Sequence, residues 1–166
     1  SAWATRRPRA LPTMLALSAL WLIALPNAPY LLTDLVHLKE RHGVPLSYDV
    51  LVFAAFALAG CTLGWVSLKH MHDAWSARVT RHWLLALDVS VIWLTGFGVY
   101  LGRFVRLNSW SVITEPVPLA SEVIDALSNP EALAFSCAFA ALFGAGFLLL
   151  LTPAPTNGES ALTLTR

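Results

Sequence analysis

Two stretches of the sequence carry the side chains best suited to bind or react with another molecule. In the first, Tyr30, Asp34 and His37 are spaced to fall on one face of an α-helix. In the second, Arg103 and Arg106 are three positions apart and share a face if the helix continues. Two guanidinium groups fit a phosphate or carboxylate, and an aspartate with a histidine can form a base–acid pair.

The residues around these side chains support a helix start and a polar boundary. Asn27 can cap the helix that begins after it, and Pro29 suits that helix's first turn. The full set of candidate binding residues is Asn27, Tyr30, Asp34, His37, Arg103, Arg106, Asn108 and Trp110.

The composition places these residues in a membrane protein. The chain has 166 residues, of which 57% are hydrophobic and 13% charged. Soluble domains carry roughly 45–50% apolar and 25% charged residues, and a small domain needs charge to cover its surface. The net charge of +1 gives no indication of a nucleic-acid partner.

Apolar runs between the charges predict an all-α bundle of about four transmembrane helices. A helix needs roughly 20 apolar residues to cross the hydrocarbon core. The runs are residues 11–25, 50–68, 83–101 and 132–151, the first continuing past a Pro-Asn-Ala-Pro break. We expect one membrane domain over residues 1–151 and a disordered polar tail over residues 152–166. Because the chain starts at Ser1, we also expect it to be N-terminally truncated.

The distribution of Lys and Arg predicts the orientation of these spans. Of the 11 basic residues, those of the two termini and of the loop before the third span should lie on one side. They are Arg6, Arg7, Arg9, Lys69, Arg78, Arg81 and Arg166. The other four are Lys39, Arg41, Arg103 and Arg106. Both termini should therefore be cytoplasmic, with the bilayer as a partner.

This topology brings the two polar stretches to the same outer boundary, because spans one and three both run outward. One interpretation is structural: Asp34 pairs with Arg103 or Arg106 and holds two helix ends together, since unpaired charges near lipid are costly. The other is a site for an anionic lipid head group or phosphate, with at least one arginine free for the ligand.

A second polar position is Asp88, an acid inside the third span. An intramembrane acid is a functional candidate, yet near the boundary it can also be solvated or bonded to a hydroxyl such as Ser18, Thr62 or Ser67. The sequence His70-Met71-His72-Asp73 is interpreted as a cytoplasmic loop, because its spacing would splay the side chains apart on a helix. We predict neither a metal site nor a cofactor.

Small residues at helical spacing mark surfaces where helices can approach closely in lipid. The pairs are Gly60 with Gly64 and Gly98 with Gly102, and the fourth span has Ser136, Ala140 and Gly144. Cys61 and Cys137 lie in apolar runs and are interpreted as packing residues.

The segments Leu25-Pro26-Asn27-Ala28-Pro29-Tyr30 through Asp34 and His37, and Tyr100 through Trp110, resemble the signatures of an uncharacterised bacterial membrane family, domain of unknown function 1361. The resemblance covers most of the chain and implies the bacterial inner membrane, but no activity. The family pattern has an aromatic residue and an acid where this chain has Leu107 and Ser111.

Three functions therefore remain open, and the sequence does not decide whether the protein is an enzyme. The first is a protein that binds, or acts on, an anionic head group or phosphate at the outer face. The second is a structural or accessory membrane subunit whose polar residues clasp helix ends. The third, a transporter component with Asp88 in its pathway, is supported only by the Pro-Asn-Ala-Pro break, since no repeat is present.

Overall fold

The computed structural model describes residues 10–38, 45–107 and 110–151, and this part of the chain is helical without strands. Four stretches in it are long and apolar enough to cross a membrane: Leu11–Asp34, Leu46–Ser76, Arg81–Val105 and Pro130–Leu150. The predicted all-α architecture with about four spans is confirmed, and the chain is built as a multi-pass membrane protein. The expected tail after residue 151 lies outside the described residues.

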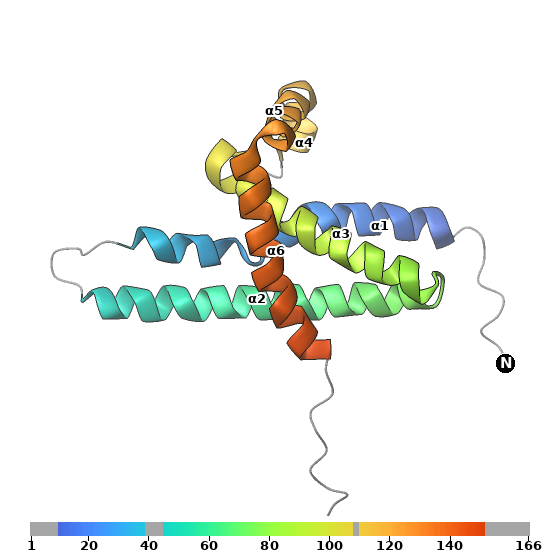
Figure 1. The fold of residues 1–166 in the computed structure, drawn as a ribbon, viewed down its shortest axis with the longest axis horizontal. Helices are drawn as coiled ribbons and strands as arrows, with labels where there is room; N and C mark the ends of the chain where they lie inside the picture. Colours follow the sequence, from blue (N-terminus) through green and yellow to red (C-terminus); the bar gives the residue numbers. More distant parts are fainter. Residues whose placement is uncertain (1–9, 39–44, 108–109, 152–166) are drawn as a thin grey trace, which may run out of the picture.

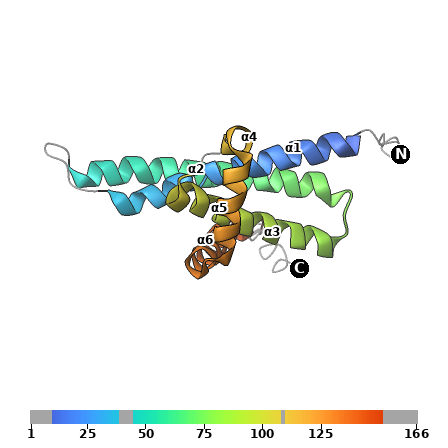
Figure 2. The ribbon, with the colours of Figure 1, turned by 90° about the horizontal axis from the view of Figure 1, so that it is seen from above.

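The first three spans lie side by side (Figures 1 and 2). Helix α1 (Ala10–Ala24), the short 3-10 helix η1 (Leu25–Asn27) and the 3-10 helix η2 (Tyr30–His37) follow one another along α2 (Leu46–Ser76). Helix α2 is antiparallel to them, and α3 (Arg81–Tyr100) returns parallel to α1. Helix α6 (Pro130–Leu151) runs across these helices rather than alongside them (Figure 1).

Helix α6 is held on α2 and α3 by aromatic and small residues. Phe139, Phe143 and Phe147 recur every four positions, are all buried, and cluster with Leu68 and Val99. Such spacing puts the three rings on one face of the helix. The helices bury this aromatic ridge, while many other leucines of the spans are exposed, as expected for helices that face lipid.

Small residues let the backbones approach at these crossings. A Cβ on Gly96 would lie 2.7 Å from the Ser136 carbonyl oxygen of α6, and one on Gly98 would lie 2.5 Å from Pro26 Cγ. Ser136 is fully buried, and its hydroxyl donates to the Ala132 carbonyl in its own helix. The small residues of spans two to four therefore do mark helix contacts, and Gly96 adds one that the spacing argument missed.

Between α3 and α6 the chain forms further helices that the sequence analysis did not predict. They are the π-helix η3 (Leu101–Val105), the single turn α4 (Ser111–Thr114) and α5 (Pro116–Ser128). The acids of α5 share one face, and its Val123 and Ala126 pack against the buried Phe97 of α3. The acidic segment after the third span is thus an amphipathic helix docked on the ends of α3 and α6.

Candidate functional site

The Pro-Asn-Ala-Pro break sets the geometry of the first polar stretch. Neither Pro26 nor Pro29 can donate a backbone hydrogen bond, so the α-helix stops and the chain continues as 3-10 helix, with Leu32 N–H donating to the Pro29 carbonyl at 3.0 Å. The side-chain amide of Asn27 donates to the Ala24 carbonyl at 3.1 Å.

This 3-10 geometry corrects the expected shared face. With about three residues per turn, side chains four apart are separated by about 120° around the axis instead of lying above one another. Tyr30 and Asp34 are therefore not stacked on an α-helical stripe. They nevertheless reach the same partner, Arg103, because that residue lies between them on the neighbouring helix.

The central contact of the site is an ion pair between the two motif stretches. Arg103 Nη1 donates to Asp34 Oδ1 at 2.5 Å, and the two side chains are 17% and 27% exposed. The Tyr30 side chain also hydrogen-bonds to Arg103. Its ring lies against Gly102, where a Cβ would be 3.3 Å from Tyr30 Cε2. The predicted pairing of Asp34 with an arginine is confirmed, and Arg103 is the partner.

Arg106 has a different environment. Helix η3 ends at Val105, and Arg106 has left-handed backbone angles, φ 61° and ψ 31°. Its N–H donates to the Leu101 carbonyl, which closes the helix end. The two arginines therefore do not share a helix face, contrary to the expectation. The Arg106 side chain is exposed and forms no ion pair with the described part of the chain.

The remaining candidates are only partly described. The backbone of His37 ends η2, while its side chain and the whole of Asn108 lie outside the described residues. Trp110 is 69% exposed at the start of the α4 turn, where its carbonyl accepts the N–H groups of Ile113 and Thr114. The structure thus joins Tyr30, Asp34 and Arg103 directly and leaves Arg106 beside them at the same end of the bundle.

The chain also matches the model of a protein family over most of its length. The model of the family described as "Protein of unknown function (DUF1361)" matches residues 1–145. The chain belongs to this family. No curated protein and no solved structure matches it. The match spans both polar stretches and most of the fourth span, so the resemblance predicted from the two motifs is confirmed.

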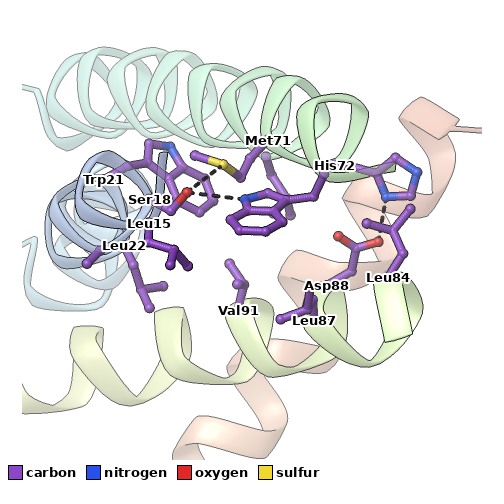
Figure 3. A pocket seen from close by; sticks show the side chains of 13 residues that line it. Leu15, Ser18, Trp21, Leu22, Met71, His72, Leu84, Leu87, Asp88 and Val91 are labelled. Carbon is purple, nitrogen blue, oxygen red and sulfur yellow. Dashed lines mark hydrogen bonds and ion pairs between the residues drawn. The ribbon is translucent and has the colours of Figure 1, made fainter. Parts of the chain in front are cut away.

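This DUF1361 protein has a second polar cluster at the other end of α3. Asp88 is buried at 9% exposure, and its Oδ2 bonds His72 Nδ1 at 2.6 Å (Figure 3). None of the expected hydroxyl partners binds it: Thr62 and Ser67 donate to carbonyls of their own helix. Sequence reasoning missed this pair because it assigned His72 to a loop.

That loop assignment is wrong, because α2 continues through Ser76. A helix of 31 residues is about 46 Å long at 1.5 Å per residue, so it extends beyond a hydrocarbon core of roughly 30 Å. Lys69 and Asp73 support the extension with an i,i+4 salt bridge of 2.9 Å.

The expected splaying of the two histidines is present on this helix. His70 bonds the Val66 carbonyl of its own helix and is exposed, while His72 turns toward α3. Within the described residues, no group of three His, Cys, Asp or Glu side chains could hold a metal ion. The His72–Asp88 pair is thus an acid–base couple between two spans.

Proposed function

We propose that this DUF1361 protein is a bacterial inner-membrane protein whose outer face binds an anionic lipid head group or phosphate through Arg106. The observation that supports this most is the exposed arginine in a left-handed backbone conformation at the end of η3. A glycine would adopt this conformation without strain, whereas for a residue with a side chain the same backbone angles destabilise the fold by roughly 1–2 kcal/mol. Because glycine would fit this position better, we attribute the presence of an arginine to a role of its guanidinium group.

Arg103 supports the site by holding the end of α3 in place. Its charge is matched by Asp34, and Tyr30 adds a hydrogen bond, so the segment that leads to Arg106 is fixed to η2. Arg106 is then an exposed cation at this end of the described bundle, and its planar fork suits phosphate oxygens.

The main alternative is a structural or accessory subunit, and the Asp34–Arg103 pair favours it as well. A cation near the last turn of a helix is also stabilised by the helix dipole, typically by about 0.3–1 kcal/mol. This alternative needs no ligand. The two proposals therefore differ in what happens when lipid is added.

The orientation is part of the proposal. The basic residues at the ends of the chain and around the α2–α3 connection place that side in the cytoplasm by the positive-inside rule. Helices α1 and α3 are parallel, since Pro26 meets Gly98 and Tyr30 meets Gly102. Arg103 and Arg106 then lie at the outer face, where head groups of the outer leaflet are within reach.

The test compares Arg106→Gly with Arg106→Lys and Arg103→Ala in thermal melting of the detergent-purified protein. Each is melted alone, with phosphatidylglycerol, and with inorganic phosphate; the two ligands distinguish a lipid from a free anion. We expect wild type to be stabilised by one of them. Arg106→Gly should match or exceed the wild-type melting temperature without ligand and lose the ligand shift. Arg106→Lys should keep only part of the shift, because the fork is lost.

Arg103→Ala is the control, because it breaks a pair instead of removing a ligand contact. It should lower the melting temperature with and without ligand. A wild type that neither compound stabilises, or an Arg106→Gly variant that keeps the full shift, would favour the structural subunit over the binding protein.

A further inference from the structure

A cavity of about 390 Å³ lies between α1, α2 and α3, and the outer-face proposal does not use it (Figure 3). Its wall includes Asp88 of α3, which precedes Arg103 of η3 by about 22 Å along the helix at about 1.5 Å per residue. The cavity is therefore at the end of the bundle opposite the Asp34–Arg103 pair. Most of its wall is aliphatic or aromatic, with Leu22, Leu68 and Val91 among the lining residues.

The cavity opens on the side between α1 and α3. Leu15 of α1 and Leu87 of α3 both line it, yet they are 52% and 43% exposed. Both helices belong to stretches long and apolar enough to cross a membrane, so an opening between them would face the bilayer. A molecule that enters here must come from the lipid phase, and an apolar chain fits such walls best.

One polar group of the wall is available to a ligand. Asp88 uses one carboxylate oxygen for His72, and its other oxygen is turned toward the interior of the cavity (Figure 3). Three other groups of the wall bond to one another: Ser18 Oγ lies 3.4 Å from Met71 Sδ and accepts Trp75 Nε1–H at 3.2 Å. The ligand end near Asp88 should therefore be a hydrogen-bond donor.

We infer that this cavity binds a membrane amphiphile with a single apolar chain and a hydrogen-bond-donating head, either an ammonium or a hydroxyl group, that is bound by Asp88. A carboxylate in a span is costly unless it is paired, and a donating head completes the pairing that His72 begins. An anionic head would be repelled by the same carboxylate. Nothing in this inference requires the outer-face anion site.

The test measures quenching of tryptophan fluorescence by chains that carry a terminal bromine, since Trp21 and Trp75 line the cavity. The full chain is reconstituted in nanodiscs and titrated at neutral pH with ω-bromododecylamine, ω-bromododecanol and ω-bromododecanoate. The first two distinguish an ammonium from a hydroxyl head. We expect saturable quenching by at least one of them, and at least tenfold weaker binding of the carboxylate.

Two variants separate the chain site from the head site. Ala19→Phe adds a ring at an exposed position of the cavity lining, where it should block the opening and abolish saturable quenching. Its control, Leu20→Phe, changes a neighbouring side chain that is 65% exposed and does not line the cavity, and it should leave quenching intact. Asp88→Asn should weaken amine binding at least tenfold and weaken alcohol binding less.

Four results would overturn the inference. They are no saturable quenching of wild type by the amine or the alcohol, equal binding of all three probes, wild-type quenching in the Ala19→Phe variant, and unchanged amine and alcohol binding in the Asp88→Asn variant. If Asp88→Asn does not fold, the Ala19→Phe and Leu20→Phe pair and the comparison of head groups in wild type still decide.

Discussion

Asp34 and Arg103 are 69 positions apart in the sequence, and their contact joins η2 to the end of α3. Both side chains are largely withdrawn from solvent, so each charge depends on the other. Removing one partner of a fully buried pair costs roughly 3–5 kcal/mol, because the remaining charge is left without compensation. The partial exposure of this pair lowers that cost, since the remaining charge can recover some hydration.

Replacing Asp34 by Ala should therefore reduce the free energy of unfolding by about 2 kcal/mol, below the range of a fully buried pair. The double variant with Arg103→Ala should recover part of the loss, because no charge is then unpaired. Unfolding in detergent, followed by circular dichroism, gives the coupling free energy of this double-mutant cycle. Additive losses would show that the two side chains do not act as a pair.

At the scale of the elements, the broken first span depends on close packing at its centre. Ala28 lies in the break, and its carbonyl oxygen sits against Gly60 of α2, where a Cβ would clash with it. Gly60 is close to the midpoint of α2. Backbone atoms on both sides make this contact rigid, so a side chain at position 60 cannot be accommodated by a rotamer change.

Gly60→Ala should consequently destabilise the fold by about 1–3 kcal/mol, the usual cost of overpacking. Gly144→Ala is the matched control, since its Cβ would meet Ile92 Cγ2 at an ordinary 3.5 Å. That control should be neutral or stabilising by up to about 1 kcal/mol, because alanine favours the helix. Thermal melting of both variants in the same detergent compares them. Similar behaviour of the two would mean that the break is not held by the Gly60 contact.

At the scale of the whole molecule, alternating helix directions fix which segments share an end. Helix α3 is parallel to α1, and α6 crosses α3 in the opposite sense, because Gly96 meets Ser136 while Gly144 meets Ile92. If all four candidate spans cross the bilayer, the two ends of the chain are expected on the same side of the membrane and α5 on the other. The charge distribution predicts that this shared side is cytoplasmic, which is the orientation proposed above.

Cysteine labelling of intact cells checks this topology in a background with Cys61 and Cys137 replaced. A membrane-impermeant maleimide should label Ala120→Cys, which is exposed on α5, and should label Ser160→Cys only after the cells are opened. Labelling of position 160 but not of position 120 in intact cells would reverse the proposed orientation.

Local chemistry allowed several features to be read from the sequence. The positions of the spans follow from the apolar runs. That the two polar stretches lie at the same end of the bundle follows from the number of spans between them. The close approach at Gly60 and Gly98 is a property of small residues at helical spacing. The pairing of Asp34 with an arginine follows because an unpaired charge at the membrane boundary is costly.

Only the tertiary structure decided which arginine pairs and which partner Asp88 takes. From the sequence alone, either Arg103 or Arg106 could pair with Asp34. In the structure the helix ends between them, and the left-handed turn at Arg106 directs the two side chains to different environments. His72 reaches Asp88 because α2 remains helical beyond its apolar run and packs there against α3. Both outcomes depend on where helices end and touch, and those positions are set by packing between segments distant in the sequence.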